Sequence, residues 1–415
     1  MFQRELYLNR LISRMNNGSI KVITGIRRSG KSVLLFNLFY DYLISQGISK
    51  DHILQYKLDN IKSRVFRDPE KLYDDIFSKM TDRQRYYLFL DEIQFVDDFS
   101  ELMNSLSQVQ NLDVYVTGSN SHFLSSDILT EFRGRGDEVR VYPFSFKEFF
   151  TVRGGDKYEA WDEYQTFGGM PALFERHTEE EKTIYLKSLV NKVYISDILE
   201  RNKIQHENEL NSIVDFLCSS IGSLTNPKKI SDTLRSLNGK SISTSTAKKY
   251  LDCLCDAFLF DYAKRYDVKG KKYFDTPLKY YVTDVGLRNA RLNFRQTEEN
   301  HIMENVIYNE LKIRGFSVDV GVVDTREIVN GKRQLKQLEI DFIANKGNKK
   351  YYVQSAYALP TTEKVEQEKR SLKKVSDSFK KIVIVKDNVR PQVDENGIVT
   401  IGLINFLLDE NSLEI

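Results

Sequence analysis

Hydrophobic and polar positions alternate in blocks along the first 150 residues, and the blocks predict strands and helices in turn. Apolar runs of strand length stand at residues 20–23, 53–58, 86–90, 114–117 and 139–142. Stretches with helical periodicity lie between them, at 1–18, directly after residue 32, at 69–80 and at 121–132. Strands that alternate with helices in this way predict an α/β domain built on a parallel sheet.

The pattern changes after residue 212. Helical stretches at 213–220, 227–237 and 243–257 are followed by two strand-like runs at 258–265 and 271–274. Three helices, a tight glycine turn and a hairpin in this order predict a winged helix-turn-helix. Residues 300–390 then follow the order helix, hairpin, strand, helix, strand, and runs at 383–386 and 399–404 predict closing strands.

A glycine-rich loop follows the first strand and opens the next helix. Its sequence, GIRRSGKS at residues 25–32, matches the phosphate-binding pattern G-x-x-x-x-G-K-[ST], the P-loop or Walker A motif. The two glycines allow a tight turn that brings backbone N–H groups against phosphate oxygens. Lys31 reaches the β- and γ-phosphates, Ser32 ligates Mg²⁺, and the helix N-terminus adds N–H donors. We expect nucleoside-triphosphate contacts from Gly25, Ile26, Arg27, Arg28, Ser29, Gly30, Lys31, Ser32 and Val33.

The strand at 86–90 ends in two carboxylates, Asp91 and Glu92. This is the Walker B pattern, in which a buried parallel strand carries the aspartate to the sheet edge, where it holds Mg²⁺ through water. Glu92 is then placed to polarise the attacking water as a general base. A strand that merely ends in two acids is the alternative, and the P-loop upstream favours the functional interpretation.

Two further catalytic groups are expected beyond this strand. Ser119 or Asn120 follows the strand at 114–117, where an ATPase senses the γ-phosphate, and a plain Ser- and Asn-rich turn is the alternative. Arg135, with Arg133 in reserve, is our candidate for stabilising transition-state charge, including charge on a neighbouring subunit's nucleotide. A solvated loop arginine explains the same residue equally simply.

Composition adds limits to these expectations. The chain has 415 residues, 41% hydrophobic and 29% charged, which is typical of a globular protein of several domains. Its formal net charge of +2 implies no global electrostatic partner, and its three cysteines make neither a disulfide framework nor a zinc pattern. No apolar stretch is long enough to span a membrane and no signal region opens the chain, so we expect a cytoplasmic protein.

Several segments together carry a family resemblance: GIRRSGKS, LFLDEIQ, VTGSNS, RGRG followed by VYPFSFKEF, and FGGMPAL. They resemble a widespread family of prokaryotic AAA-type ATPases, in which an ATPase core is joined to a C-terminal region related to nuclease folds. The resemblance covers nearly the whole chain and is most specific in the paired arginines of the P-loop. It implies an ATPase whose P-loop strand lies centrally in the sheet, with residues 158–215 forming a helical lid.

Two other nucleotide chemistries fit the motifs less well. No Asn-Lys-x-Asp guanine signature occurs, so we expect ATP rather than GTP. A small-molecule kinase would need an arginine-rich lid, for which the RGRG segment is a candidate. A hydrolytic base such as Glu92 would be counterproductive in a kinase, which favours an ATPase.

The winged-helix segment is locally basic. From Lys228 to Lys279 there are twelve basic residues against six acidic ones. The last of its three helices carries Thr244, Ser245, Lys248 and Lys249 near its start, which are suited to contacts with phosphates or bases. The alternative is a module that packs against protein while its lysines are merely solvated.

The C-terminal block resembles the PD-(D/E)xK nuclease core. In that core an acid on one strand and a Glu or Gln two residues before a Lys on the next strand gather Mg²⁺ and the attacking water. By this resemblance Glu304 is the helix acid, Asp341 the metal-binding aspartate and Gln354 the first member of the strand pair.

The sequence departs from that core at its lysine. Ala356 stands where the lysine belongs, and Gln354 replaces a charged ligand by a neutral one. Lys369 or Arg370 on the following helix could substitute from another backbone position. We interpret the block as a degenerate nuclease fold kept for binding or assembly.

These patterns predict an α/β architecture of four parts. We expect an AAA-type P-loop ATPase core at 1–155, a helical lid at 156–212, a winged helix-turn-helix at 213–290 and a restriction-endonuclease-like α/β domain at 291–415. The predicted function is Mg²⁺-dependent ATP hydrolysis coupled to conformational change on double-stranded DNA, without a membrane partner. An ATP-dependent nuclease and a nucleotide-switched scaffold without nucleic acid are the alternatives, and a homo-oligomer would suit the arginine of a neighbouring subunit. The pathway, the DNA recognised and the roles of Arg27 and Arg28 do not follow from the sequence.

Overall fold

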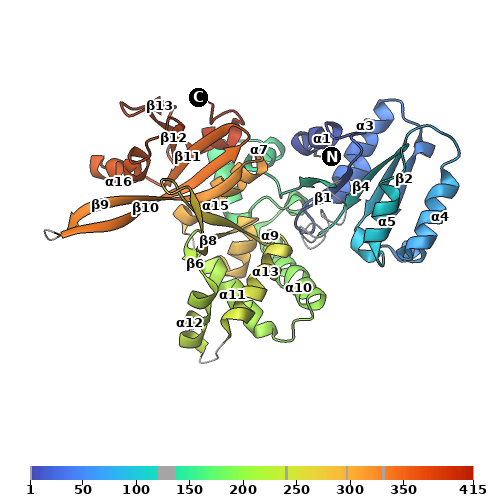
Figure 1. Ribbon diagram of the computed structural model, residues 1–415, viewed down its shortest axis with the longest axis horizontal. Helices are drawn as coiled ribbons and strands as arrows, with labels where there is room; N and C mark the ends of the chain where they lie inside the picture. The colour runs from blue at the N-terminus through green and yellow to red at the C-terminus, as the bar shows by residue number, and fades with distance from the viewer. Residues whose placement is uncertain (1, 120–135, 239–241, 296–297, 330–331, 415) are drawn as a thin grey trace. The chain divides into compact units, whose positions relative to one another are not determined.

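The chain divides into two units (Figure 1). The first comprises residues 1–143 with 256–258, and the second comprises 144–255 with 259–415, so the four predicted parts fall into two units. The computed structural model describes residues 2–119, 136–238, 242–295, 298–329 and 332–414. The helix predicted at 121–132 lies outside these ranges. No helix within them is both long and apolar enough to cross a membrane.

A five-stranded parallel sheet forms the centre of the first unit, in the order β2-β3-β4-β1-β5. The apolar runs predict β1 to β4 closely, and β1, β3 and β4 are buried along their whole length. The run predicted at 139–142 overlaps β5 only at Val139 and Arg140, because most residues of β5 are polar. β1, which precedes the P-loop, lies between β4 and β5, one position from the edge rather than at the middle of the sheet. The strands are β1 (Ile20–Thr24), β2 (Ile53–Lys57), β3 (Tyr86–Asp91), β4 (Leu112–Thr117) and β5 (Gly136–Arg140).

Helices connect these strands and bury aromatic side chains against them. Phe39 packs with Phe89 and Tyr115 from two neighbouring strands, at ring-centroid distances of 5.7 and 4.7 Å. Asp68 caps the helix after β2 by accepting hydrogen bonds from its first N–H groups. The helices are α1 (Glu5–Ile12), the continuous run α2 (Lys31–Val33), η1 (Leu34–Phe39) and α3 (Tyr40–Ser45), then α4 (Pro69–Lys79) and α5 (Phe99–Leu106), with short 3₁₀ turns η2 (Lys50–His52), η3 (Ile61–Arg67) and η4 (Ile93–Phe95).

A buried ion pair joins β1 to β4 inside this sheet. The ammonium of Lys21 contacts the carboxylate of Asp113, and both side chains are almost wholly buried. The hydroxyl of Tyr115 donates to the second oxygen of Asp113 at 2.8 Å, and the Asn16 N–H does so at 3.0 Å. A charge placed in the interior is tolerated here because every oxygen of its partner is engaged.

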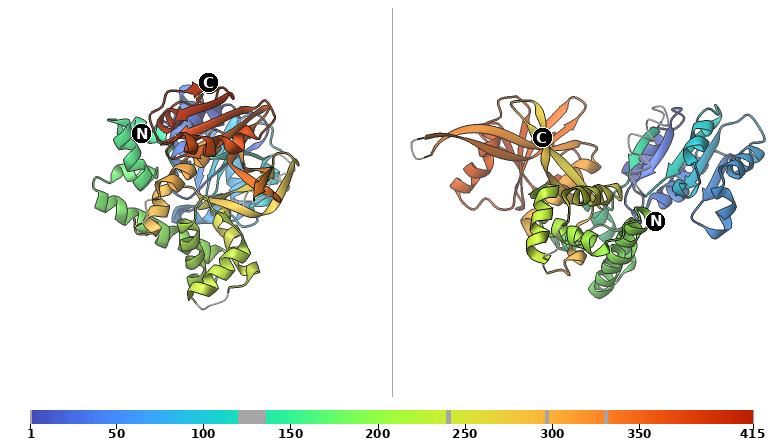
Figure 2. Two further views of the ribbon diagram at one scale, coloured as in Figure 1. Left: turned by 90° about the vertical axis from the view of Figure 1, so that its left-hand side faces the viewer. Right: turned by 60° about the horizontal axis from the view of Figure 1, so that its bottom comes forward.

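The second unit contains a mixed nine-stranded sheet, in the order β13-β14-β12-β11-β10-β9-β7-β8-β6. Its strands are β6 (Leu224–Thr225), β7 (Phe260–Asp267), β8 (Lys272–Val282), β9 (Ser317–Val329), β10 (Lys332–Lys346), β11 (Lys349–Ala356), β12 (Lys380–Val385), β13 (Gln392–Val393) and β14 (Ile398–Gly402). β9 and β10 continue together as a two-stranded ribbon beyond the body of this unit (Figures 1 and 2).

The helices of the second unit precede this sheet or cover it. They are α7 (Phe146–Arg153), α8 (Lys157–Phe167), η6 (Pro171–Glu175), α9 (Glu179–Ser188), η7 (Leu189–Ile195), α10 (Ser196–Arg201), α11 (Glu207–Ser219), α12 (Pro227–Asn238), α13 (Thr244–Asp256), α14 (Val285–Arg291), α15 (Glu299–Ile313), α16 (Thr362–Lys373) and α17 (Leu403–Leu408). The predicted boundary at 290 does not separate two sheets, because β7 pairs in parallel with β9 at Arg265, Tyr266 and Asp267.

The segment FGGMP packs tightly against the start of α14 within the second unit. Asp284 is buried, accepts a hydrogen bond from the Gly169 N–H at 2.7 Å and caps α14 with its other oxygen. Gly168 has a φ of +75°, and a Cβ there would lie 2.1 Å from an oxygen of Asp284. A Cβ at Gly286 would lie 1.9 Å from the Phe167 carbonyl oxygen. Only glycines allow these two segments to meet so closely.

Burial raises the pKa of Asp284 to about 6, from 3.8. The folded state therefore holds this proton more tightly than the unfolded state, and the stability it contributes is lost as the pH rises through about 6. Relative to Asp284→Asn, which cannot ionise, the wild type should lose up to about 3 kcal/mol of unfolding free energy between about pH 4 and about pH 7. Urea unfolding of both proteins across this range measures the difference, and parallel pH profiles would contradict the assignment.

Candidate nucleotide-binding site

The P-loop connects β1 to the helix that begins at Lys31, and both of its glycines have positive φ angles. Gly25 has a φ of +129°, and a Cβ there would lie 2.0 Å from the carbonyl oxygen of Val141. Gly30 has a φ of +98° at the N-terminus of the helix. The loop therefore lies at the carboxyl end of β1 with a helix directly behind it, which is the context that the motif requires.

Lys31 lies within the loop that it belongs to. Its ammonium donates to the carbonyl oxygens of Gly25 and Ile26 at 2.9 and 3.1 Å, and the residue is 4% exposed. The two arginines of the loop differ from it, because the side chains of Arg27 and Arg28 are exposed. The ammonium of Lys31 is therefore held against the backbone that would surround a phosphate.

Two hydroxyl groups converge on one oxygen of Asp91, the last residue of β3. Ser32 donates to its Oδ1 at 3.0 Å and Thr117 donates to the same atom at 2.6 Å. The predicted metal ligands Ser32 and Asp91 therefore lie in contact, although 59 positions separate them in the chain. Thr117 ends β4, and its importance was not visible in the sequence because a threonine in an apolar run looks like an ordinary strand residue.

Burial raises the pKa of Asp91, and the hydrogen bonds from Thr117 and Ser32 oppose that rise. A carboxylate and a hydroxyl fit Mg²⁺, which takes few protein ligands and obtains the rest from phosphate and water. Within the described ranges no three His, Cys, Asp or Glu side chains are arranged to hold a metal by themselves. The donor set thus suits a metal that arrives with a nucleotide.

Glu92 follows Asp91 in the left-handed region, with a φ of +54°. Its N–H donates to the Thr117 hydroxyl at 2.9 Å, and its carboxylate accepts a hydrogen bond from Ser119 at 3.2 Å. The Gln94 side-chain amide donates to the same oxygen of Glu92. Ser119, one of two predicted sensor residues, is therefore in contact with the predicted base. Gln94 is an addition that the sequence did not suggest.

The other predicted catalytic residues of this unit cannot be placed. Asn120, Arg133 and Arg135 lie outside the described residues. The proposed γ-phosphate sensor role of Asn120 and the transition-state role of Arg135 therefore stay predictions.

Arg4 contacts the P-loop from the N-terminal segment, which sequence patterns did not indicate. Its guanidinium donates to the carbonyl oxygen of Ser29 at 2.7 Å and to that of Tyr142 at 2.8 Å, and the residue is 6% exposed. In a trans peptide the C=O and the N–H point in opposite directions. Holding the Ser29 carbonyl toward Arg4 therefore turns the Gly30 N–H away from it, which leaves that donor for a phosphate oxygen.

We expect Arg4→Gln to weaken ATP binding by about tenfold, because a charged hydrogen bond that orients the loop is lost. Isothermal titration with a non-hydrolysable ATP analogue measures the change. Arg14→Gln is the matched control, since it removes an ion pair with Asp137 in the same unit without touching the loop. Equal affinities in both variants would contradict the role of Arg4.

Comparison with known proteins agrees with the position of this site. The family model described as "AAA domain" matches residues 17–150, and the one described as "Domain of unknown function (DUF8612)" matches residues 158–298. Among solved structures, the Aeropyrum pernix ORC1 protein in complex with DNA aligns with a TM-score of 0.31 and 11% identity, covering 71% of this chain and 93% of that one. A STAND protein from Pyrococcus horikoshii aligns with a TM-score of 0.27 and 15% identity, covering 74% and 46%.

Full-length relatives give the stronger relationship. A protein of Methanocaldococcus jannaschii, described as uncharacterized, is 29% identical over 86% of this chain and 79% of its own length. A Haemophilus influenzae protein, described in the same way, is 36% identical over 98% of this chain and 99% of its own length. The chain therefore belongs to the same family as the Haemophilus influenzae protein, and it carries an AAA domain followed by a domain of unknown function.

Proposed function

We propose that this chain is a Mg²⁺-dependent ATPase. The observation that carries the proposal is the meeting of the P-loop hydroxyl of Ser32 with the buried carboxylate of Asp91. Lys31 neutralises charge on the β- and γ-phosphates, and Ser32 with Asp91 holds the Mg²⁺ that accompanies them. The metal supplies electrostatic stabilisation of the charge that develops on the transferred phosphoryl group.

Glu92 is the proposed general base for the attacking water. The contacts from Ser119 and Gln94 to one carboxylate oxygen orient the group, and the second oxygen is the proposed acceptor of the water proton. A hydrolytic base next to the metal-binding aspartate favours an ATPase over a kinase. Coupling to conformational change, and assembly with a neighbouring subunit that contributes Arg135, belong to the same proposal.

Glu92→Gln should lower the rate of ATP hydrolysis by about a hundredfold or more, while ATP binding survives, because a general base contributes on that scale. Phosphate release under saturating Mg²⁺-ATP measures the rate, and titration with ATP measures the binding. Lys31→Ala should instead lose the binding itself. Glu101→Gln, the same substitution at an exposed position of α5, is the control. Wild-type turnover by Glu92→Gln would refute this assignment.

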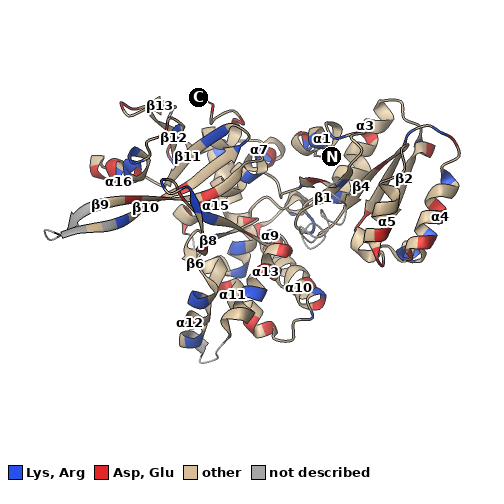
Figure 3. Ribbon diagram, in the orientation of Figure 1, with Lys and Arg blue, Asp and Glu red and all other residues tan. Residues whose placement is uncertain are grey.

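A second candidate function is DNA binding by the segment α11–β6–α12–α13–β7–β8. Its three helices and the strand order with β8 between β7 and β6 support the interpretation as a winged helix-turn-helix. Figure 3 shows basic residues along α12 and α13. The exposed ones are Lys228, Lys229, Arg235, Lys248 and Lys249. We propose that this face contacts the phosphate backbone of DNA.

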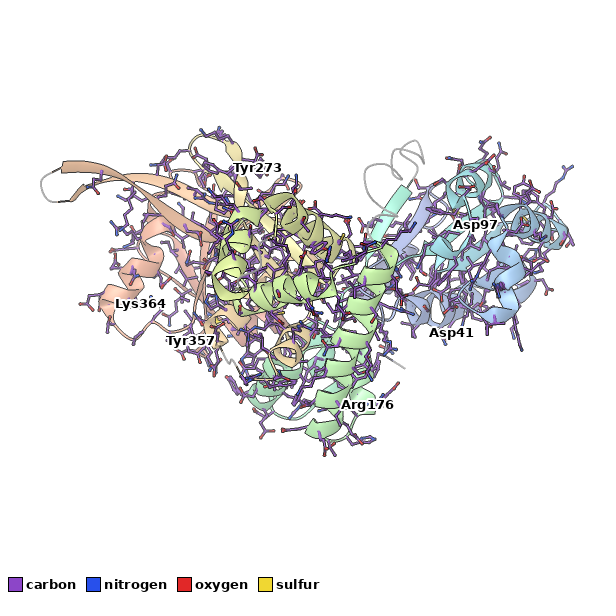
Figure 4. The ribbon with its side chains drawn as sticks, turned by 90° about the horizontal axis from the view of Figure 1, so that it is seen from below. Asp41, Asp97, Arg176, Tyr273, Tyr357 and Lys364 are labelled. Atoms are coloured by element: carbon purple, nitrogen blue, oxygen red, sulfur yellow. The ribbon has the colours of Figure 1, made fainter. Side chains whose placement is uncertain are left out.

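The β7–β8 hairpin of this segment is in contact with β9, which favours the helices as the proposed DNA-contacting elements. Tyr273, near the turn of the β7–β8 hairpin (Figure 4), donates to Asp319 at 3.0 Å. Lys269 donates to the Asp324 carbonyl oxygen at 2.9 Å. Since both contacts join the hairpin to β9, the proposed DNA surface is α12 with α13 rather than the wing.

Replacing Lys248 and Lys249 together by Glu should weaken binding to double-stranded DNA and make its salt dependence shallower by about two, because each lost phosphate contact releases about one counterion fewer. Fluorescence anisotropy across a salt series measures both quantities. The matched control reverses two adjacent exposed lysines at the end of α16, Lys373 and Lys374. An unchanged salt slope in the first variant would remove DNA binding from this face.

A further inference from the structure

The acids of the nuclease-like block meet a lysine that comes from outside that block. Glu304 on α15 lies near Glu339 and Asp341 on β10, and Lys279 of β8 reaches all three. Its ammonium lies 3.0 Å from Glu304, 2.7 Å from Glu339 and 3.6 Å from Asp341. Lys279 is 4% exposed, so this ammonium has exchanged its water for carboxylates.

Two further donors of the chain contact this acid cluster. Tyr281 donates its hydroxyl hydrogen to the same oxygen of Glu304 at 2.8 Å. The Ser355 N–H donates to the second oxygen of Asp341, also at 2.8 Å. Burial and the charge of Glu304 raise the pKa of Asp341 despite the nearby ammonium. Both oxygens of Asp341 and one oxygen each of Glu304 and Glu339 therefore contact donors of the chain itself.

The residues to which the nuclease resemblance assigns metal and water binding make other contacts in this chain. Gln354 accepts from the Asp341 N–H and donates to Glu368, both at 3.4 Å. Ala356, at the expected lysine position, is buried among apolar side chains. Lys369, a predicted substitute, pairs with Asp394 at 2.8 Å instead. The described residues present no set of three acid, His or Cys ligands arranged for a metal.

We propose that Lys279 is the built-in cation of this acid cluster and occupies the place that a divalent metal takes in the resembled nuclease core. An ammonium in contact with all three acids opposes the binding of a divalent metal between them, because like charges repel strongly where burial lowers the dielectric response. The acid cluster therefore fastens β8 to α15 and β10, and the block does not hydrolyse nucleic acid with a metal. This inference is independent of the proposed ATPase activity.

The first experiment uses the full-length wild type and Asp341→Asn. Both are incubated with plasmid DNA and Mg²⁺ or Mn²⁺, and bound Mn²⁺ is counted by electron paramagnetic resonance without nucleotide. We expect no cleavage and equal Mn²⁺ binding in the two proteins. Cleavage by the wild type that Asp341→Asn abolishes would overturn the proposal, because Lys279 would then serve an active nuclease as its missing lysine. Greater Mn²⁺ binding by the wild type would overturn it as well.

The second experiment removes the internal cation. Lys279→Met, which keeps most of the length of the side chain without its charge, should bind an additional Mn²⁺ ion and melt at a higher temperature when Mn²⁺ is present. Adding Asp341→Asn should abolish that gain. Lys369→Met is the matched control, since it removes a buried lysine that has a single carboxylate partner, and it should gain no Mn²⁺.

Each outcome of the second experiment bears on the proposal. A folded Lys279→Met protein that binds no additional Mn²⁺ would contradict it, because the three carboxylates would then not form a cation position. If Lys279→Met fails to fold without metal but folds with Mn²⁺, the metal has replaced the ammonium, which supports the proposal. If it folds in neither condition, the comparison of wild type with Asp341→Asn decides the question.

Discussion

The buried carboxylate of Asp91 is the constraint on which the nucleotide site depends. β3 carries this group to the end of the sheet, where it is 5% exposed and accepts hydrogen bonds from the hydroxyls of Ser32 and Thr117. Desolvation disfavours the charged form, and two neutral donors offset only part of that cost. A metal that arrived with a phosphate would offset the rest of this desolvation cost. The same burial that raises the pKa of Asp91 therefore favours cation binding at this position.

The carboxylate also organises its surroundings through Thr117. This hydroxyl donates to Asp91 and accepts from the Glu92 N–H, so one side chain fixes the metal-binding acid and the backbone of the proposed base together. The left-handed backbone of Glu92 turns its side chain toward Ser119 and Gln94. Direct hydrogen bonds through Thr117 thus join the proposed metal ligand Asp91 to the proposed base Glu92.

What the sequence predicts depends on whether a feature is local. The P-loop, Asp91 and Glu92 follow from short motifs next to apolar strands, and β1 to β4 follow from their hydrophobic runs. Arg4 could not be found in this way, because its contact with Ser29 spans 25 positions and depends on how α1 packs. β8 extends to Val282, well beyond the predicted run, because it pairs with β7 up to that residue and with β6 at Leu278 and Lys279. Pairing between β7 and β9 is likewise a property of the folded chain.

Two groups of acids in this chain differ in how their negative charge is balanced. At Asp91 the neighbours are neutral hydroxyls, so the charge of the carboxylate is left for an exchangeable cation to balance. At Glu304, Glu339 and Asp341 the balancing charge is Lys279, which is covalently part of the chain and cannot leave. The first arrangement suits a site that binds and releases a metal with its nucleotide. The second suits a permanent joint, and Lys21 with Asp113 is a smaller example of it. The two proposals for these acids therefore differ in the mobility of the counter-ion, a property that a list of acidic residues does not contain.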